Sequence, residues 1–146
     1  MAQPILLPML VLAGWTMLVW VWMYATRLPA MARAGIDGTR LVGSTGKGLR
    51  DQLVAAGEER ASWVADNYNH LMEQPTIFYA TALALAVMGE GGSIAVNLAW
   101  GYAGLRIAHS LVQILSNRVL VRFAVFALAS LCLIGLVLLA LSVASS

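Results

Sequence analysis

Residues 66–122 decide the fold: in DNYNHLMEQPTIFYATALALAVMGEGGSIAVNLAWGYAGLRIAHSLVQILSNRVLVR, ionisable and amide side chains interrupt sequence that is otherwise apolar enough to lie in a lipid bilayer. A charged residue in the middle of a membrane helix costs about 2.5–3.5 kcal/mol on insertion scales. Asp66, Glu73, Arg106 and Arg122 are therefore candidate functional residues, unless they lie at the membrane edge.

The composition of the whole chain is that of an integral membrane protein. Of its 146 residues 60% are hydrophobic and 11% are charged, and the mean hydropathy is +0.79. The formal charge of +2 does not indicate a nucleic-acid partner, because six of the nine Lys and Arg residues fall between Arg27 and Arg60. A cluster of that kind reports membrane topology instead. The single Cys132 excludes a disulfide within the chain.

Hydropathy predicts one domain, residues 1–146, built as an antiparallel four-helix transmembrane bundle. Basic residues gather in the first loop and the third turn, so these two connections are expected on the cytoplasmic side and both termini outside. The expected spans and the cytoplasmic loop are, in order, about 4–26, 28–59 (loop), 62–88, 93–115 and 119–143.

The connections between the spans are predicted from helix-breaking residues. Arg27 followed by Pro29 is expected to end the first helix, and 49–54 to form a short amphipathic turn on the membrane surface. The second helix is expected to be continuous over 60–88. Residues 43–48 resemble a phosphate-binding loop only loosely, because Leu41 stands where its first glycine should be and Gly48 where Ser or Thr should follow the lysine.

Polar residues share one face on each of the two middle helices. At 100° per residue a sector about 80° wide holds the polar face of the second helix, and a similar sector holds that of the third. The members are, in chain order, Asp66, Asn69, Glu73 and Thr76 on the second helix, and Arg106, His109, Gln113 and Asn117 on the third. Such a stripe must face protein or water, because lipid offers it no hydrogen bonds.

Two structural interpretations compete with a functional one. Arg106 could pair with Glu73 or Asp66 as a buried ion pair that only fixes helix register. Arg122 lies one turn after the third connection, so it could extend to the headgroups without any chemical role. No metal site is expected, because the chain has two histidines and the third span carries no carboxylate.

Three segments together resemble a known family. NHLMEQPTIF at 69–78 is followed by WGYAGLRIAHS at 100–110 and then by Arg118 and Arg122. This series is similar to the MAPEG family, the membrane-associated proteins of eicosanoid and glutathione metabolism, in its bacterial-type members. The resemblance implies a four-helix protomer in a homotrimer, with glutathione as co-substrate bound between subunits near the cytoplasmic side. It implies a multi-pass protein of the cell (inner) membrane if the source is bacterial.

The resemblance also implies roles for individual residues. Asn69 and Glu73 match the second-helix pair that holds glutathione, and Arg106 and His109 match polar residues of the third helix. Arg122 matches the arginine that faces the glutathione sulfur and is the expected catalytic residue.

The match to the family pattern has departures. Gln113 is included among the expected glutathione-binding residues although synthase members often carry tyrosine there, and Phe126 also stands at a tyrosine position. The acid usually follows Asn69 by three residues, where this chain has Met72, and Glu73 comes one position later.

Three functions are compatible with this sequence. The first is a glutathione-dependent transferase or peroxidase acting on lipophilic electrophiles that enter from the bilayer. The second is a non-enzymatic protein that binds lipid, or a scaffolding or accessory subunit of a larger membrane complex. A proton-coupled exporter ranks last, because it should carry a carboxylate deep in a span, whereas Glu73 lies in the polar third of the second helix.

Overall fold

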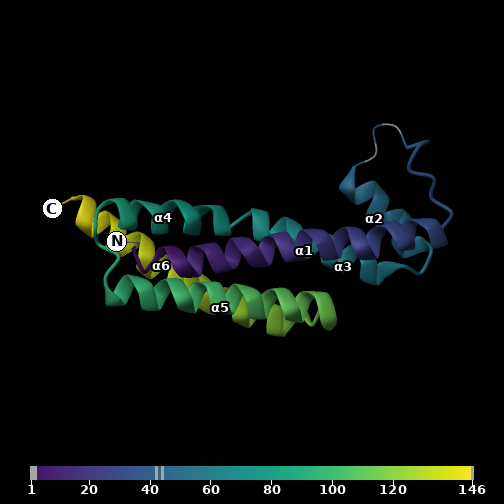
Figure 1. Cartoon of the computed structure of the whole chain (residues 1–146). Coiled ribbons are helices and arrows are strands. Elements are labelled where there is room, and N and C mark those ends of the chain that lie inside the picture. The colour runs from purple at the N-terminus through teal and green to yellow at the C-terminus, as the bar shows by residue number, and fades with distance from the viewer. Residues whose placement is uncertain (1–2, 42, 44, 146) are drawn as a thin grey trace.

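The computed structural model describes residues 3–41, 43 and 45–145, which form a rod of helices without strands (Figure 1). The helices of the described chain are α1 (Leu6–Arg33), α2 (Gly46–Ala55), α3 (Glu59–Met72), α4 (Pro75–Val87), α5 (Ser93–Leu115) and α6 (Val119–Ala144). Both ends of the chain and the turn between α4 and α5 lie at one end of the rod, and α2 lies at the other (Figure 1).

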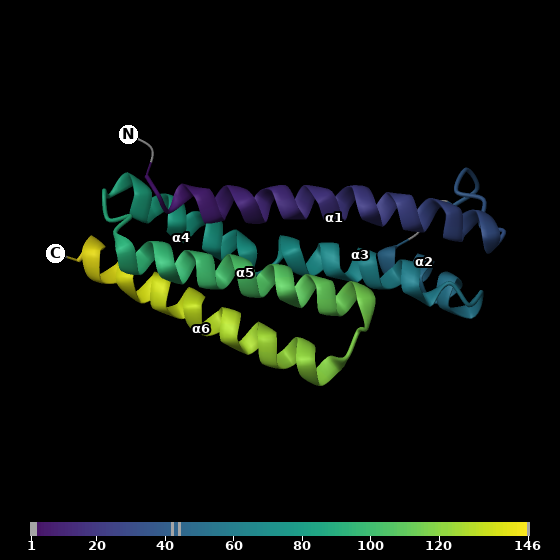
Figure 2. The same ribbon diagram turned by 60° about the horizontal axis from the view of Figure 1, so that its bottom comes forward.

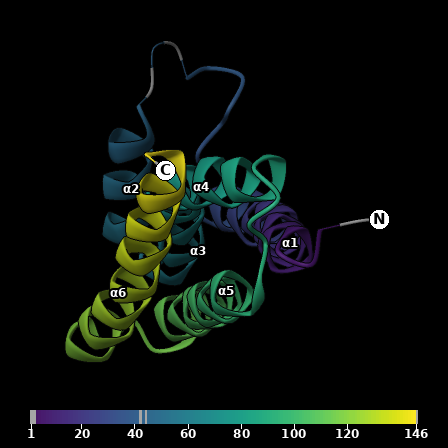
Figure 3. The same cartoon turned by 90° about the vertical axis from the view of Figure 1, so that its left-hand side faces the viewer.

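The helices pack as an antiparallel bundle. α5 and α6 form a hairpin, and α1 runs along α3, α4 and α5 (Figure 2). Viewed along the rod, α1 and α6 lie on opposite sides, with α5 and the α3–α4 pair between them (Figure 3). The all-helical class is therefore as expected from the sequence.

α1 does not end at Arg27, and the expected helix end there is wrong. The helix continues through Pro29 to Arg33, although proline removes one helical hydrogen bond. Packing offsets that loss, because Ala30 is fully buried against Leu53 of α2 and Ala61 of α3.

An ion pair also holds the last turn of α1. Arg33 Nε and Nη2 donate to the two carboxylate oxygens of Glu58 over 2.6 and 2.7 Å. These hydrogen bonds hold the pKa of the Glu58 carboxyl below its ordinary value. The pair is exposed, so it positions the last turn of α1 more than it stabilises the fold.

The amphipathic turn expected at 49–54 is the longer helix α2. Thr45 caps it, since its hydroxyl oxygen accepts from the Gly48 amide over 3.1 Å. Leu53 is buried and anchors α2 to the ends of α1 and α3. The helix α2 therefore covers the ends of α1 and α3 at one end of the bundle.

The second helix is broken rather than continuous, which corrects the expectation for 60–88. α3 ends at Met72, Glu73 takes φ −89° and ψ −97°, and α4 starts afresh at Pro75. The cause is Pro75, which has no amide hydrogen to continue the helix and is well suited to its first position. Thr76 then belongs to α4, where its hydroxyl donates to the Glu73 carbonyl over 2.7 Å.

Two of the described helices, α1 and α6, are long and apolar enough to cross a membrane. α4 has 13 residues, about 20 Å at 1.5 Å per residue, which is shorter than a hydrocarbon core of about 30 Å. A second crossing would therefore need part of α3 as well. The four-span bundle stays a prediction.

Close packing of α5 on α6 depends on glycines. A methyl group added at Gly101 would lie 3.1 Å from Cys132 Sγ, and one at Gly135 would lie 3.3 Å from a methyl of Leu98. Small residues of this kind let membrane helices approach closely. Gly104, also on α5, has nothing within 4 Å of an added methyl group.

We expect Gly101→Leu to lower the free energy of unfolding by about 1–3 kcal/mol through overpacking. Gly104→Leu, the same change on the same helix, should alter it by less than about 1 kcal/mol, because the site is open. Thermal unfolding of the two variants in mild detergent measures the difference. Equal losses in both would contradict the packing account.

The connection between α1 and α2 and the turn between α4 and α5 lie at opposite ends of the rod (Figure 1), and the predicted topology places them on opposite sides of the membrane. Thr39 belongs to the first and Glu90 to the second. In a Cys132→Ser background, we expect Thr39→Cys to react with an impermeant maleimide only after the cells are permeabilised. Glu90→Cys should react in intact cells. The reverse pattern would invert the topology.

Candidate functional site

The centre of the candidate site is Arg106 on α5, which is 1% exposed. Its Nη2 donates to the carbonyl oxygen of His70 in the last turn of α3. Carbonyls at a helix C-terminus lack partners within the helix and attract cations. The guanidinium carbon also lies 5.5 Å from the centre of the Phe126 ring on α6, a distance at which a cation is attracted to an aromatic face.

The expected ion pair between Arg106 and Glu73 or Asp66 does not form in the described protomer. Asp66 Oδ2 lies 3.3 Å from Arg50 Nη1, and Glu73 Oε2 lies 3.2 Å from His70 Nδ1. The partners of Arg106 are thus a backbone carbonyl and an aromatic ring. Its buried charge joins three helices without using a carboxylate.

Three members of the polar stripe on α5 face the interior, as expected. Arg106, His109 and Gln113 are 1%, 5% and 2% exposed. His109 Nδ1 lies 3.1 Å from the Arg122 carbonyl oxygen. Since a carbonyl only accepts, Nδ1 carries the proton and, in the neutral ring, Nε2 is an acceptor.

Arg122 is held by the turn that precedes it. Its Nη1 donates to Oδ1 of Asn117, which adopts the left-handed conformation with φ 50°. Asparagine tolerates this conformation better than most residues. The α5–α6 turn therefore sets the direction of the Arg122 side chain.

His109 and Arg122 line one cavity of about 270 Å³ between α3, α5 and α6. The rings of His70 and His109 are 6.2 Å apart, and those of His109 and Phe126 are 6.0 Å apart. The full lining is His70, His109, Val119, Arg122, Phe123 and Phe126. Two basic groups thus meet aromatic rings in a space open to the molecular surface.

The other expected site residues do not line this cavity. Asn69 lines a different cavity, of about 310 Å³, between α1, α2 and α3. Glu73 is exposed at the break between α3 and α4. Gln113 is buried one turn beyond His109 and does not line the 270 Å³ cavity. Of the expected residues, His109 and Arg122 line the 270 Å³ cavity, and Arg106 packs against Phe126 of its wall.

Sequence reasoning missed a polar junction at Gln74. Gln74 Nε2 donates to Ser130 Oγ over 2.9 Å, and Tyr102 donates to Gln74 Oε1 over 3.3 Å. The junction links the start of α4 to α5 and α6. Pro75 was the available signal, because a break before it exposes polar groups that need partners.

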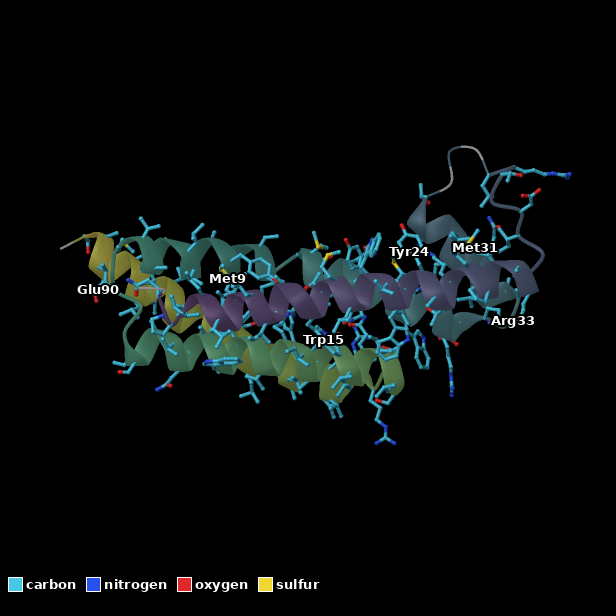
Figure 4. All side chains as sticks on the ribbon, in the orientation of Figure 1. Met9, Trp15, Tyr24, Met31, Arg33 and Glu90 are labelled. Atoms are coloured by element: carbon cyan, nitrogen blue, oxygen red, sulfur yellow. The ribbon has the colours of Figure 1, made fainter. Side chains whose placement is uncertain are left out.

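A second polar junction links α1 to the middle of the bundle. Trp15 points from α1 towards α5 (Figure 4). Its Nε1 donates to Ser110 Oγ over 2.9 Å, and Nδ2 of the fully buried Asn67 donates to the same oxygen. These bonds hold α3 and α5 in the register that places Arg106 beneath His70.

The comparison that decides the relationship is with protein families: the sequence model of the MAPEG family matches residues 5–142. The chain belongs to the MAPEG family. No curated protein and no solved structure matches it. The expected family is thus confirmed, and with it a membrane-associated protein in which α1 and α6 are candidate spans.

Within this MAPEG chain the role of Arg106 can be tested by substitution. Arg106→Lys removes the planar group that reaches the His70 carbonyl and covers Phe126. We expect it to lower the free energy of unfolding by about 1.5–3 kcal/mol. Arg118→Lys, at the exposed α5–α6 turn, is the matched control and should change it little. Thermal unfolding in detergent compares the two, and an unchanged Arg106→Lys protein would refute the central role.

Proposed function

We propose that this MAPEG protein binds glutathione and activates its thiol in the cavity between α3, α5 and α6. The observation that carries the proposal is the meeting of Arg122 and His109 in that cavity, in a chain of this family. A guanidinium beside a thiol favours the thiolate and lowers the thiol pKa. His109 Nε2 is the acceptor for the proton that leaves.

The product follows from the electrophile that meets the thiolate. In a conjugation the sulfur forms a bond to carbon, and a leaving group departs or the proton is returned to the adduct. In a peroxidase reaction the thiolate attacks one oxygen of a hydroperoxide, the O–O bond breaks, and the alkoxide takes up a proton and leaves as the alcohol. The sulfenic acid of glutathione then reacts with the thiol of a second glutathione, which forms the disulfide and releases water. Phe123 and Phe126 line the cavity, which favours lipophilic electrophiles that arrive from the bilayer.

Two exposed residues near the break after α3 are the proposed partners for the remaining parts of glutathione. Asn69 lies in the last turn of α3, and Glu73 follows the end of the helix. The Glu73 carboxylate offers a partner to the amino group of the γ-glutamyl residue. A binding site between subunits of a homotrimer accords with this exposure, because a neighbouring protomer could cover these side chains.

A second candidate is a non-enzymatic member that binds lipid or serves as a subunit of a larger membrane complex. It is favoured by Phe126, which lines the cavity where synthase members of the family often carry tyrosine. Without that hydroxyl one hydrogen bond to a ligand is lost. Binding without thiolate formation would distinguish this function from the first.

We expect glutathione at 100 times its dissociation constant to add about 2.7 kcal/mol to the apparent stability of the detergent-purified protein. Bound glutathione should show the ultraviolet absorbance of a thiolate. Arg122→Leu and Arg122→Lys should lose most of that absorbance, because neither offers paired planar donors. Each unit by which the thiol pKa is lowered corresponds to about 1.4 kcal/mol of preference for the anion.

Arg118→Leu is the matched control, since it removes a charge from the same turn outside the cavity. It should retain the thiolate signal. Undiminished absorbance and turnover in Arg122→Leu would remove Arg122 from the mechanism. Absence of any stabilisation by glutathione would reject the first function altogether.

A further inference from the structure

A second cavity, of about 310 Å³, lies between α1, α2 and α3 at the end of the rod that holds the basic loop. Its lining includes three basic side chains and one carboxylate, and shares no residue with the cavity of Arg122. The lining is Met23, Arg27, Gly46, Lys47, Arg50, Ser62, Ala65, Asp66 and Asn69.

The residues that line this cavity carry more positive than negative charge. Arg50 Nη1 lies 3.3 Å from Asp66 Oδ2, which neutralises that carboxylate. Lys47 Nζ pairs with Asp51, which does not line the cavity, over 2.8 Å. Arg27 Nε is buried, and no residue of the described chain accepts a hydrogen bond from it. An anion entering the cavity would therefore meet Arg27, which has no carboxylate partner in the described chain, and would compete with Asp51 for Lys47.

The N-terminus of α2 opens onto the same cavity. The Thr45 hydroxyl accepts from the amide of Gly48, the third residue of the helix. The Thr45 carbonyl accepts from the amide of Leu49. The two earlier residues, Gly46 and Lys47, line the cavity. Amides in the first turn of a helix have no helical acceptor and carry a partial positive charge. The ten-residue α2 therefore presents donors to the cavity.

Ser62 supplies an independent sign that a ligand belongs here. It lines the cavity from α3 and is 2% exposed, yet its Oγ has no hydrogen-bond partner among residues 3–41, 43 and 45–145. Buried hydroxyls are normally hydrogen-bonded, and each exception calls for an explanation. An acceptor oxygen in the cavity would satisfy Ser62 Oγ as well as Arg27 Nε.

We propose that this cavity binds a phosphate group. A tetrahedral anion with several acceptor oxygens can accept simultaneously from a guanidinium, an ammonium, a hydroxyl and the amides of a helix N-terminus. The group comes either from the headgroup of a phospholipid or from a soluble phosphate ester. The proposal does not depend on glutathione binding, because its donors come chiefly from α1, α2 and Ser62.

The test uses the full-length protein in uncharged detergent, with three probes followed by thermal shift. Dioctanoyl phosphatidylglycerol and glycerol 3-phosphate carry the phosphate, and dioctanoylglycerol lacks it. We expect saturable stabilisation by at least one of the phosphate probes and none by dioctanoylglycerol. Stabilisation by phosphatidylglycerol alone identifies a lipid source, whereas equal stabilisation by glycerol 3-phosphate identifies a soluble one. No stabilisation, or equal stabilisation by dioctanoylglycerol, overturns the proposal.

Variants assign the effect to this cavity. Lys47→Gln should weaken binding about tenfold by removing a charged donor, and Ser62→Ala about fivefold by removing the hydroxyl. Ser62→Ala should fold normally, because that hydroxyl has no partner in the described chain. Arg40→Gln is the control, since it removes a charge from the same loop but pairs with Asp37 outside the cavity. An equal loss in Arg40→Gln would show nonspecific attraction and overturn the proposal.

A competition separates the phosphate site from the proposed thiol site. Asn69 lines this cavity and is also a proposed glutathione partner, but none of the proposed phosphate donors is. Saturating glutathione should therefore leave the affinity for the phosphate probe unchanged. Displacement of the probe by glutathione would assign this cavity to the thiol ligand and overturn the inference. Arg122→Leu should likewise retain phosphate binding, since Arg122 does not line this cavity.

Discussion

The structure depends on one buried cation, Arg106, which joins the broken end of α3 to α5 and α6. Burying a charge is unfavourable unless it is paired. Here Nη2 donates to the His70 carbonyl and the guanidinium lies over the face of Phe126, whereas Nε and Nη1 have no hydrogen-bond partner in the described chain. The carbonyl is available because Pro75 stops the helix a few residues later. The helix break and the buried arginine therefore account for each other, which neither residue alone would indicate.

The sequence predicted the helical class, the buried polar stripe on α5 and the family, because hydropathy, 3.6-residue periodicity and local motifs carry these features. The expected helix boundaries were wrong at both prolines. A helix end was expected near Pro29, where α1 continues, and a continuous helix was expected through Pro75, where α4 begins. Proline disfavours a helix interior at both places. Burial of Ala30 keeps α1 helical past the first, whereas the second starts a new helix. Tertiary contacts decide between the outcomes, and they are not visible in the local sequence.

The sequence indicates which polar side chains belong to each helix, but not how the helices bring them together. A helical wheel shows which side chains share a face only while the helix continues, and α3 ends at Met72, between Asn69 and Glu73. The wheel cannot show which other helix covers that face. Asn69 and His70 are consecutive, yet they line separate cavities, one bounded by α1 and α2 and the other by α5 and α6. Polar residues that are adjacent in the sequence of α3 thus line different cavities on different faces of the helix.

The proposed chemistry requires a water-soluble thiol to meet a lipophilic partner, and the position of Arg122 bears on this requirement. Arg122 follows the α5–α6 turn closely and is succeeded by an apolar helix without another charge. With α6 as a membrane span, a cation in its first turn would lie between water and hydrocarbon, where its desolvation cost is small and its attraction for a thiolate is stronger than in bulk water. Phe123 is the next residue of α6. It lines the same cavity and is largely exposed, so the cavity reaches the surface of α6 that would face lipid. A site deeper in the bundle would exclude the thiol, and one further out would leave the thiolate solvated, so the first turn of α6 is where both reactants can be held.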